Sequence, residues 1–115
     1  MIDVLLINPR SIGMADSPRI FPSSLLYLAS TLQYNNIKVD ILDLNVIEGD
    51  INSLIIEKIK SDCPLIVGIG CLFSGHFRMV RDIASLIKTY SNNITIAIGG
   101  IHPTIYAKEI IENCQ

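Results

Sequence analysis

Four short aliphatic segments, each followed by a stretch of helical periodicity, constrain the fold of this chain more than any other feature. The aliphatic segments cover residues 3–8, 38–44, 65–70 and 94–98. Between them, apolar residues recur three and four positions apart, as they do in amphipathic helices. We therefore predict a (βα)4 chain with helices from Pro22 to the Asn35-Asn36 pair and over residues 51–61, 76–90 and 104–113, with Pro64 ending the second.

Right-handed crossovers between such strands lead to an α/β fold with a doubly wound parallel sheet. We expect a flavodoxin-like, Rossmann-like three-layer sandwich with strand order 2-1-3-4. The second segment alternates Val39 and Ile41 with Asp40, which is typical of an edge strand, whereas the third is continuously apolar and central. The buried helix residues are expected to be Leu25, Leu28, Ala29 and Leu32, then Leu54, Ile55 and Ile59, then Val80, Ile83, Ala84 and Ile87.

A flavodoxin-like sheet has a fifth strand after the fourth helix, and the sequence supplies none. Residues 1–115 are therefore expected to be one domain and a fragment of a longer protein. The edge of the fourth strand is predicted to be unpaired, which favours self-association.

Composition excludes several classes of protein. Half of the residues are hydrophobic and 17% are charged, and the net charge of −2 argues against a nucleic-acid surface. No apolar run is long enough to span a bilayer, and no signal peptide is evident, so a cytoplasmic protein is expected. The three cysteines lack C-x-x-C spacing, so no metal site is predicted in this chain.

The candidate ligand site lies where strands one and three end, because open α/β sheets bind ligands at this switch point. Three loops meet there, and glycines 68, 70, 99 and 100 remove side chains where a ligand would approach the backbone. The candidate cofactor-binding residues are Asn8, Pro9, Arg10, Cys71, Leu72, Ser74, Gly99, Gly100 and His102.

Each candidate also has a purely structural interpretation. The glycines suit turns, Ser74 suits a helix cap, His102 suits a loop hydrogen bond, and Cys71 suits core packing. Arg10 suits a solvated position, a phosphate or a partner domain. The sequence lacks the complete G-x-G-x-x-G and G-x-x-x-x-G-K-[ST] motifs, so neither a dinucleotide fingerprint nor a P-loop is predicted.

In order along the chain, five segments resemble the N-terminal B12-binding-like domain of cobalamin-dependent radical SAM enzymes. They are VLLINP at 4–9, PSSLLYLA at 22–29, VDILD at 39–43, IVGIGC at 66–71 and IGGIHPT at 98–104. The frame Asn8-x-Arg10-x-x-Gly13 is similar to the D-x-H-x-x-G loop that ligates cobalt through His. Arg10 stays protonated and cannot coordinate a metal.

The resemblance implies a cobalamin without a protein axial His ligand, in a methyltransferase or anaerobic oxidoreductase. Asn8, Pro9 and Arg10 would lie near the corrin, Ser74 near its nucleotide tail, and Gly99 and Gly100 along that tail. The radical SAM domain, with S-adenosylmethionine and a 4Fe-4S cluster, would be the partner in the missing part, so this chain alone is not expected to be an enzyme. Two alternatives remain: a degenerate docking scaffold without cofactor, and a domain for another nucleotide-like ligand.

Overall fold

The computed structural model describes residues 1–9, 23–70, 77–100, 108 and 111–112. Its strands are β1 (Val4–Asn8), β2 (Val39–Asp43), β3 (Ile66–Gly70) and β4 (Thr95–Gly99). Its helices are α1 (Ser23–Tyr34), α2 (Ile51–Asp62) and α3 (Phe77–Tyr90). All strand pairs are parallel and the order is β2-β1-β3-β4, which confirms the predicted topology and the edge position of β2.

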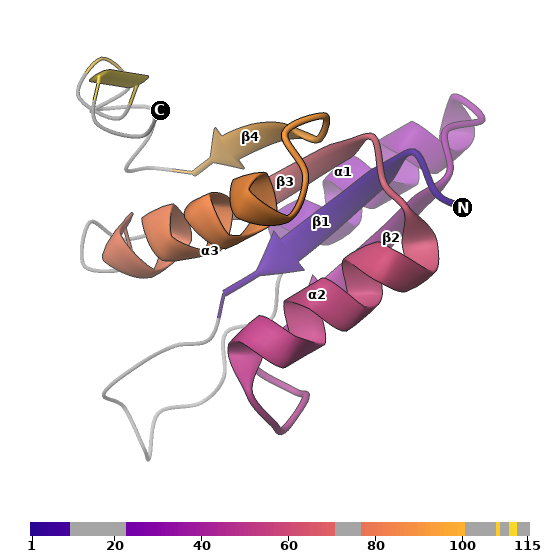
Figure 1. Cartoon of the computed structure of the whole chain (residues 1–115). Coiled ribbons are helices and arrows are strands. Elements are labelled where there is room, and N and C mark those ends of the chain that lie inside the picture. Colours follow the sequence, from indigo (N-terminus) through magenta and orange to yellow (C-terminus); the bar gives the residue numbers. More distant parts are fainter. Residues whose placement is uncertain (10–22, 71–76, 101–107, 109–110, 113–115) are drawn as a thin grey trace.

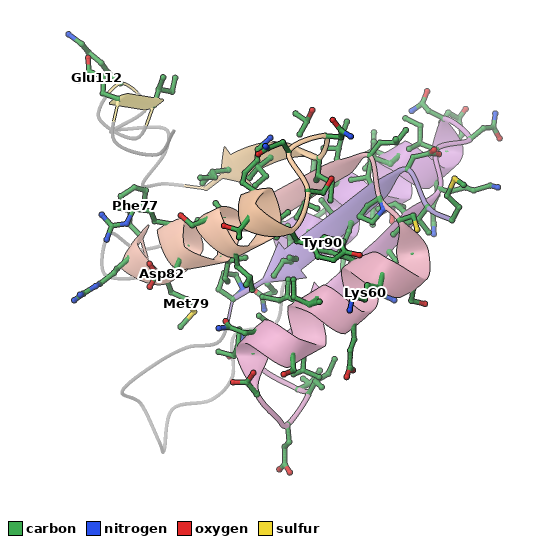
Figure 2. All side chains as sticks on the ribbon, viewed as in Figure 1. Lys60, Phe77, Met79, Asp82, Tyr90 and Glu112 are labelled. Atoms are coloured by element: carbon green, nitrogen blue, oxygen red, sulfur yellow. The ribbon has the colours of Figure 1, made fainter. Side chains whose placement is uncertain are left out.

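The helices cover opposite faces of the sheet, with α2 and α3 on one face and α1 on the other (Figure 1). Between α2, α3 and the sheet lies the larger hydrophobic core, where Figure 2 shows densely arranged side chains. Its buried members are Leu5, Ile7, Leu42, Leu44, Ile55, Ile59, Val67, Ile69, Val80, Ile83, Ile87 and Ile94. The α2 and α3 residues expected to face the sheet are thus buried or, for Leu54 and Ala84, partly buried against this core.

The core beneath α1 is smaller. Its buried residues are Val4, Leu6 and Leu25, with Ala29 and Leu32 partly buried at its border. The prediction for Leu28 was wrong, because its side chain is 52% exposed. Helix α1 lies over β1 and β2, and Leu28 is on a flank of the helix that this packing leaves exposed.

Local signals at the ends of α2 fix its length. Asp50 accepts a hydrogen bond from the Ser53 backbone N–H at the helix start, as N-cap residues do. At the other end Cys63 adopts a left-handed conformation, with φ of 48°, and its N–H donates to the Ile59 carbonyl. The helix thus ends at Asp62, with Cys63 as its C-cap directly before Pro64.

Three expectations about element ends lie outside the described residues. They are the position of Pro22 at the start of α1, that of His76 at the start of α3, and most of the helix predicted over residues 104–113. Within the described part of the chain, no helix is both long and apolar enough to cross a membrane.

Candidate functional site

The carboxyl ends of the strands form one edge of the molecule, where Asn8, Gly70 and Gly99 end β1, β3 and β4. The chain leaves β1 toward α1 on one face and leaves β3 toward α3 on the other (Figure 1). Strands β1 and β3 are neighbours, so their ends define the switch point of this sheet. The sequence placed the candidate site at this point.

A polar cluster joins the ends of β1 and β2. The Asn8 Nδ2 and the Asn45 backbone N both donate to Asp43 Oδ1, each over 3.0 Å. The Asn45 Nδ2 donates to the Pro9 carbonyl oxygen over 3.1 Å, and Asn45 is only 8% exposed. One more bond runs from the Leu44 N–H to the Asn8 carbonyl oxygen, over 3.0 Å. This cluster fixes the backbone where it leaves β1.

Small residues line the part of the sheet that α1, the one described helix on that face, does not cover (Figure 1). Gly68 lies beside Ala97 and Gly70 beside Gly99 in the register of β3 and β4. We call these four residues the small-residue strip. Ala97 and Gly99 are exposed, and both strip residues of β3 are half-buried. The strip consists of two residue pairs: Gly70 and Gly99 at the carboxyl ends of β3 and β4, and Gly68 and Ala97 two residues earlier in each strand.

The strip glycines differ in what a side chain would meet. A Cβ at Gly99 would have no atom within 4 Å, and one at Gly70 would meet only the Ile7 carbonyl oxygen at 3.9 Å. A Cβ at Gly68 would lie 2.8 Å from Leu6 Cδ2. Gly68 therefore serves the packing of β1 against β3, whereas Gly70 and Gly99 leave open surface.

Leu28 and Gln33 lie on opposite flanks of α1. Gln33, on the other side of the buried Leu25 around the helix, lines a shallow hollow with Lys38 and Val39 at the start of β2. At 3.6 residues per turn, Leu28 lies on the opposite flank, which is directed toward β3. Leu28 is thus an exposed apolar residue on the flank of α1 that is directed toward β3 and the small-residue strip.

Gly100 directly follows β4 and adopts a conformation that side chains disfavour, with φ of 121°. The backbone conformation therefore accounts for a glycine at position 100. At position 99 the backbone does not require a glycine, and its absent side chain leaves the surface open.

Of the predicted site residues, the structure describes Asn8, Pro9, Gly99 and Gly100. Asn8 and Pro9 meet in the polar cluster, and Gly99 adjoins Gly70 across the β3–β4 ladder. The remaining candidates, Arg10, Cys71, Leu72, Ser74 and His102, lie outside the described residues.

Sequence reasoning missed Asp43 and Asn45 as site residues. The available signal was a pair of polar residues directly after the alternating edge strand, next to the strand that carries Asn8. Among the described residues, no group of three His, Cys, Asp or Glu side chains could hold a metal ion.

These features define an α/β domain with a candidate ligand site at its switch point and, beside it, a strip of small residues that no described helix covers. The B12 binding domain family matches residues 17–115. The chain therefore belongs to this family.

Similar proteins include the cytidylyl-2-hydroxyethylphosphonate methyltransferase of Streptomyces wedmorensis, 28% identical over an alignment 128 residues long. That alignment covers 96% of this chain and 24% of the methyltransferase. The chain thus spans about a quarter of the length of this curated relative.

Solved structures show the same fold. The radical S-adenosylmethionine methyltransferase TsrM from Kitasatospora setae, with tryptophan and a SAM analogue bound, superposes with a TM-score of 0.81 at 22% identity, covering 97% of this chain and 22% of that one. The same enzyme with cobalamin and a [4Fe-4S] cluster gives 0.76 at 24% identity, covering 95% and 21%. A cobalamin-binding protein from Desulfitobacterium hafniense gives 0.56 at 18% identity, covering 86% and 44%.

Proposed function

We propose that this domain binds cobalamin at the carboxyl edge of its sheet. The observation that carries the proposal is the small-residue strip, which leaves backbone open to a ligand directly beside the switch point. A corrin with a nucleotide tail is large and partly flat, and such a group needs surface from which side chains have been removed. Membership of the B12 binding domain family supports this choice of ligand.

The described residues would contact two parts of the cofactor, the corrin ring and the nucleotide tail. Asn8 and Pro9, fixed by the polar cluster, would lie beneath the corrin, and Gly70 and Gly99 would lie along the nucleotide tail. Leu28 would contact the tail from the α1 side, which accounts for an apolar side chain at an exposed position. Arg10, Cys71, Leu72, Ser74, Gly100 and His102 remain proposed contacts from the sequence.

The domain would serve as the cobalamin module of a radical SAM enzyme of methyltransferase or anaerobic oxidoreductase type. Cobalamin supplies a transferable methyl group in such chemistry. The residues of this chain would bind and orient the cofactor, with no axial His at position 10. S-adenosylmethionine and a 4Fe-4S cluster would be bound by a neighbouring domain of a longer protein. The names of the methyltransferase relatives support this assignment.

The outer edge of β4 would pair with another strand. Within the described residues β4 has a partner only in β3. The strand could come from the longer protein or, in this chain alone, from a second copy. Sedimentation equilibrium over a range of concentrations tests self-association, and a monomer throughout would exclude it.

Titration of the chain with hydroxocobalamin, followed by absorbance, tests the proposed function. Saturable binding at one site per chain, with a rise in Tm, is the expected result, because a ligand of the folded state stabilises that state. A parallel titration with nucleotides serves as the comparison. Absence of binding by both this chain and the longer protein would favour the docking scaffold, and a nucleotide-specific rise in Tm would favour a different ligand.

A further inference from the structure

We infer that Asp43 and Asn45 are positioning residues that hold Asn8 and Pro9, at the end of β1, in the geometry needed for corrinoid binding. This inference rests on the proposed function, because it concerns the same edge of the sheet. Asp43 and Asn45 belong to the chain just after β2, whereas the residues that they hold belong to the end of β1. They therefore act on the site through Asn8 and Pro9.

The first argument is the geometry of Asp43. Its Oδ1 accepts from the Asn8 side chain and from the Asn45 backbone, each over 3.0 Å. Asn8 lies opposite Asp43 in the β1–β2 register, so this is a side-chain bond between directly paired positions. A charged acceptor makes both bonds stronger than a neutral one would. The carboxylate thus orients the Asn8 amide and the turn that contains Asn45 together.

The second argument is the burial of Asn45. It is the single buried polar residue among those that the structure describes, and its Nδ2 donates to the Pro9 carbonyl oxygen. Pro9 has no N–H, so it cannot continue the ladder on its donor side. Its carbonyl is held by a side chain rather than by a neighbouring strand. A buried amide with this bond fixes the position of the Pro9 carbonyl.

The network also lies on the face that carries the small-residue strip. Asn8 and Asp43 follow the alternation of Leu6 and Ile41, which face α1, and Gly68 and Gly70 share that face. The side chain of Asn8 and the small-residue strip thus lie on the same face of the sheet, and Pro9 directly follows Asn8. A shift of Pro9 would alter the surface presented at the switch point without disturbing the larger core beneath α2 and α3.

Three variants test the inference by hydroxocobalamin titration of the full chain, each at a temperature where circular dichroism shows it folded. Asn45→Leu keeps the branching and the number of non-hydrogen atoms of the side chain but removes the donor to Pro9, and Asp43→Leu removes the acceptor. Each is expected to weaken the affinity about tenfold or more. Asp43→Asn keeps an oxygen acceptor and is expected to restore the affinity to within about threefold of the wild type.

Asp40→Asn is the matched control. Asp40 lies on the same strand but pairs with Lys58 of α2, away from the polar cluster. It is expected to leave the affinity unchanged even if it lowers Tm. Equal affinity for the wild type and a folded Asn45→Leu variant would overturn the inference.

Amide hydrogen exchange of the ligand-free protein tests the positioning role directly. The Leu44 amide, which donates to the Asn8 carbonyl, and the Asn45 side-chain amide are expected to exchange slowly in the wild type and at least tenfold faster in Asp43→Leu. Unchanged exchange would overturn the inference. Failure of the wild type to bind hydroxocobalamin would instead contradict the proposed function, so the two failures are distinguishable.

Discussion

Gly68 of β3 lies directly against Leu6 of β1, where an added Cβ would come within 2.8 Å of Leu6 Cδ2. Leu6 is buried beneath α1, so it can yield only by shifting within the smaller core. Gly68→Ala is therefore expected to destabilise the domain by about 1–2 kcal/mol, the range of a modest overpacking change. Urea denaturation measures this loss as a lower midpoint with an unchanged m-value.

Gly99→Ala is the matched control, because a Cβ there meets no atom within 4 Å. Its free energy of unfolding is expected to stay within about 0.5 kcal/mol of the wild type. Equal effects of the two substitutions would show that β1–β3 packing does not require Gly68.

Gly99→Val separates binding from stability. Valine suits a strand, and position 99 is exposed at the end of β4, so the fold should be retained or slightly stabilised. The same side chain would occupy the open surface where the nucleotide tail is proposed to lie. The affinity for hydroxocobalamin is expected to fall at least tenfold in absorbance titrations. Unimpaired binding by the folded variant would remove Gly99 from the proposed site.

Leu28→Gln tests the α1 border of the same surface. The side chain is 52% exposed, so its replacement should change the free energy of unfolding by less than about 0.5 kcal/mol. Loss of an apolar contact to a bound tail should weaken cobalamin affinity several-fold. Tyr27→Gln, at a 77% exposed position of the same helix, is the control and should bind as the wild type does.

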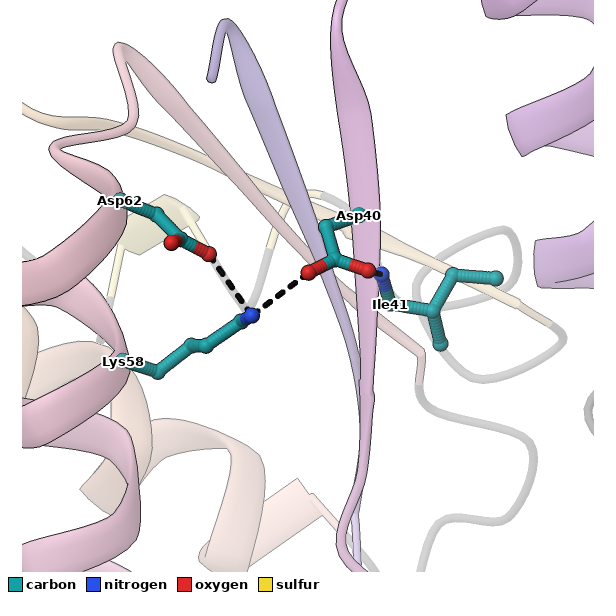
Figure 3. A network of polar contacts seen from close by, with 4 residues as sticks. All are labelled: Asp40, Ile41, Lys58 and Asp62. Carbon is teal, nitrogen blue, oxygen red and sulfur yellow. Dashed lines mark hydrogen bonds and ion pairs between the residues drawn. The ribbon is translucent and has the colours of Figure 1, made fainter. Parts of the chain in front are cut away.

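Lys58 of α2 joins two carboxylates, Asp40 on β2 and Asp62 one turn along its own helix (Figure 3). The Asp62 Oδ2 is buried and accepts no hydrogen bond of good geometry from the described residues, so the ammonium 2.8 Å away is its compensating charge. Lys58→Met should therefore cost about 1–2 kcal/mol, because it leaves a buried carboxylate oxygen unpaired. The exposed pair with Asp40 adds little. Lys60→Met, an exposed position of the same helix shown in Figure 2, is the charge-matched control in urea denaturation.

The difference between wild type and Lys58→Met should depend on pH. The hydrogen bond from Lys58 lowers the pKa of Asp40 below 3.8, and the hydrogen bond to Asp40, followed by the ion pair with Asp62, raises the pKa of Lys58 above 10.5. The Asp40 contribution is present above pH 3.8 and is lost as the pH falls through its lowered pKa. The Lys58 contribution is present below pH 10.5 and is lost as the pH rises through its raised pKa. Urea midpoints at pH 3, 7 and 11 should thus differ most at pH 7, and a constant difference would contradict this account.

Strand order was predictable because it depends on a pattern that covers the whole chain. The continuous apolar run of β3 and the alternation of Val39, Asp40 and Ile41 in β2 distinguish a central strand from an edge strand. Right-handed crossovers then leave few topologies. The ends of the described elements were also predicted to within a residue or two, and the Asn35-Asn36 pair was the signal for the end of α1.

The site was predictable only in part. Its position follows from topology, so Asn8 and Gly99 were found from the strand ends on which they lie. Asp43 and Asn45 were missed because their roles depend on the β1–β2 register and on a backbone turn, and periodicity specifies neither. Leu28 was misplaced for a related reason. Helical spacing identifies an apolar flank, but only the structure shows that α1 stands over β1 and β2 and leaves that flank uncovered.

The two cores are unequal, and the candidate site lies on the weaker side. Helix α1 is anchored by one buried residue, Leu25, whereas α3 buries Val80, Ile83 and Ile87. Displacing α1 thus exposes far less apolar surface than displacing α3, and local opening follows the smaller cost. A large ligand would therefore be accommodated by displacement of α1, while α2 and α3 stay packed against the sheet.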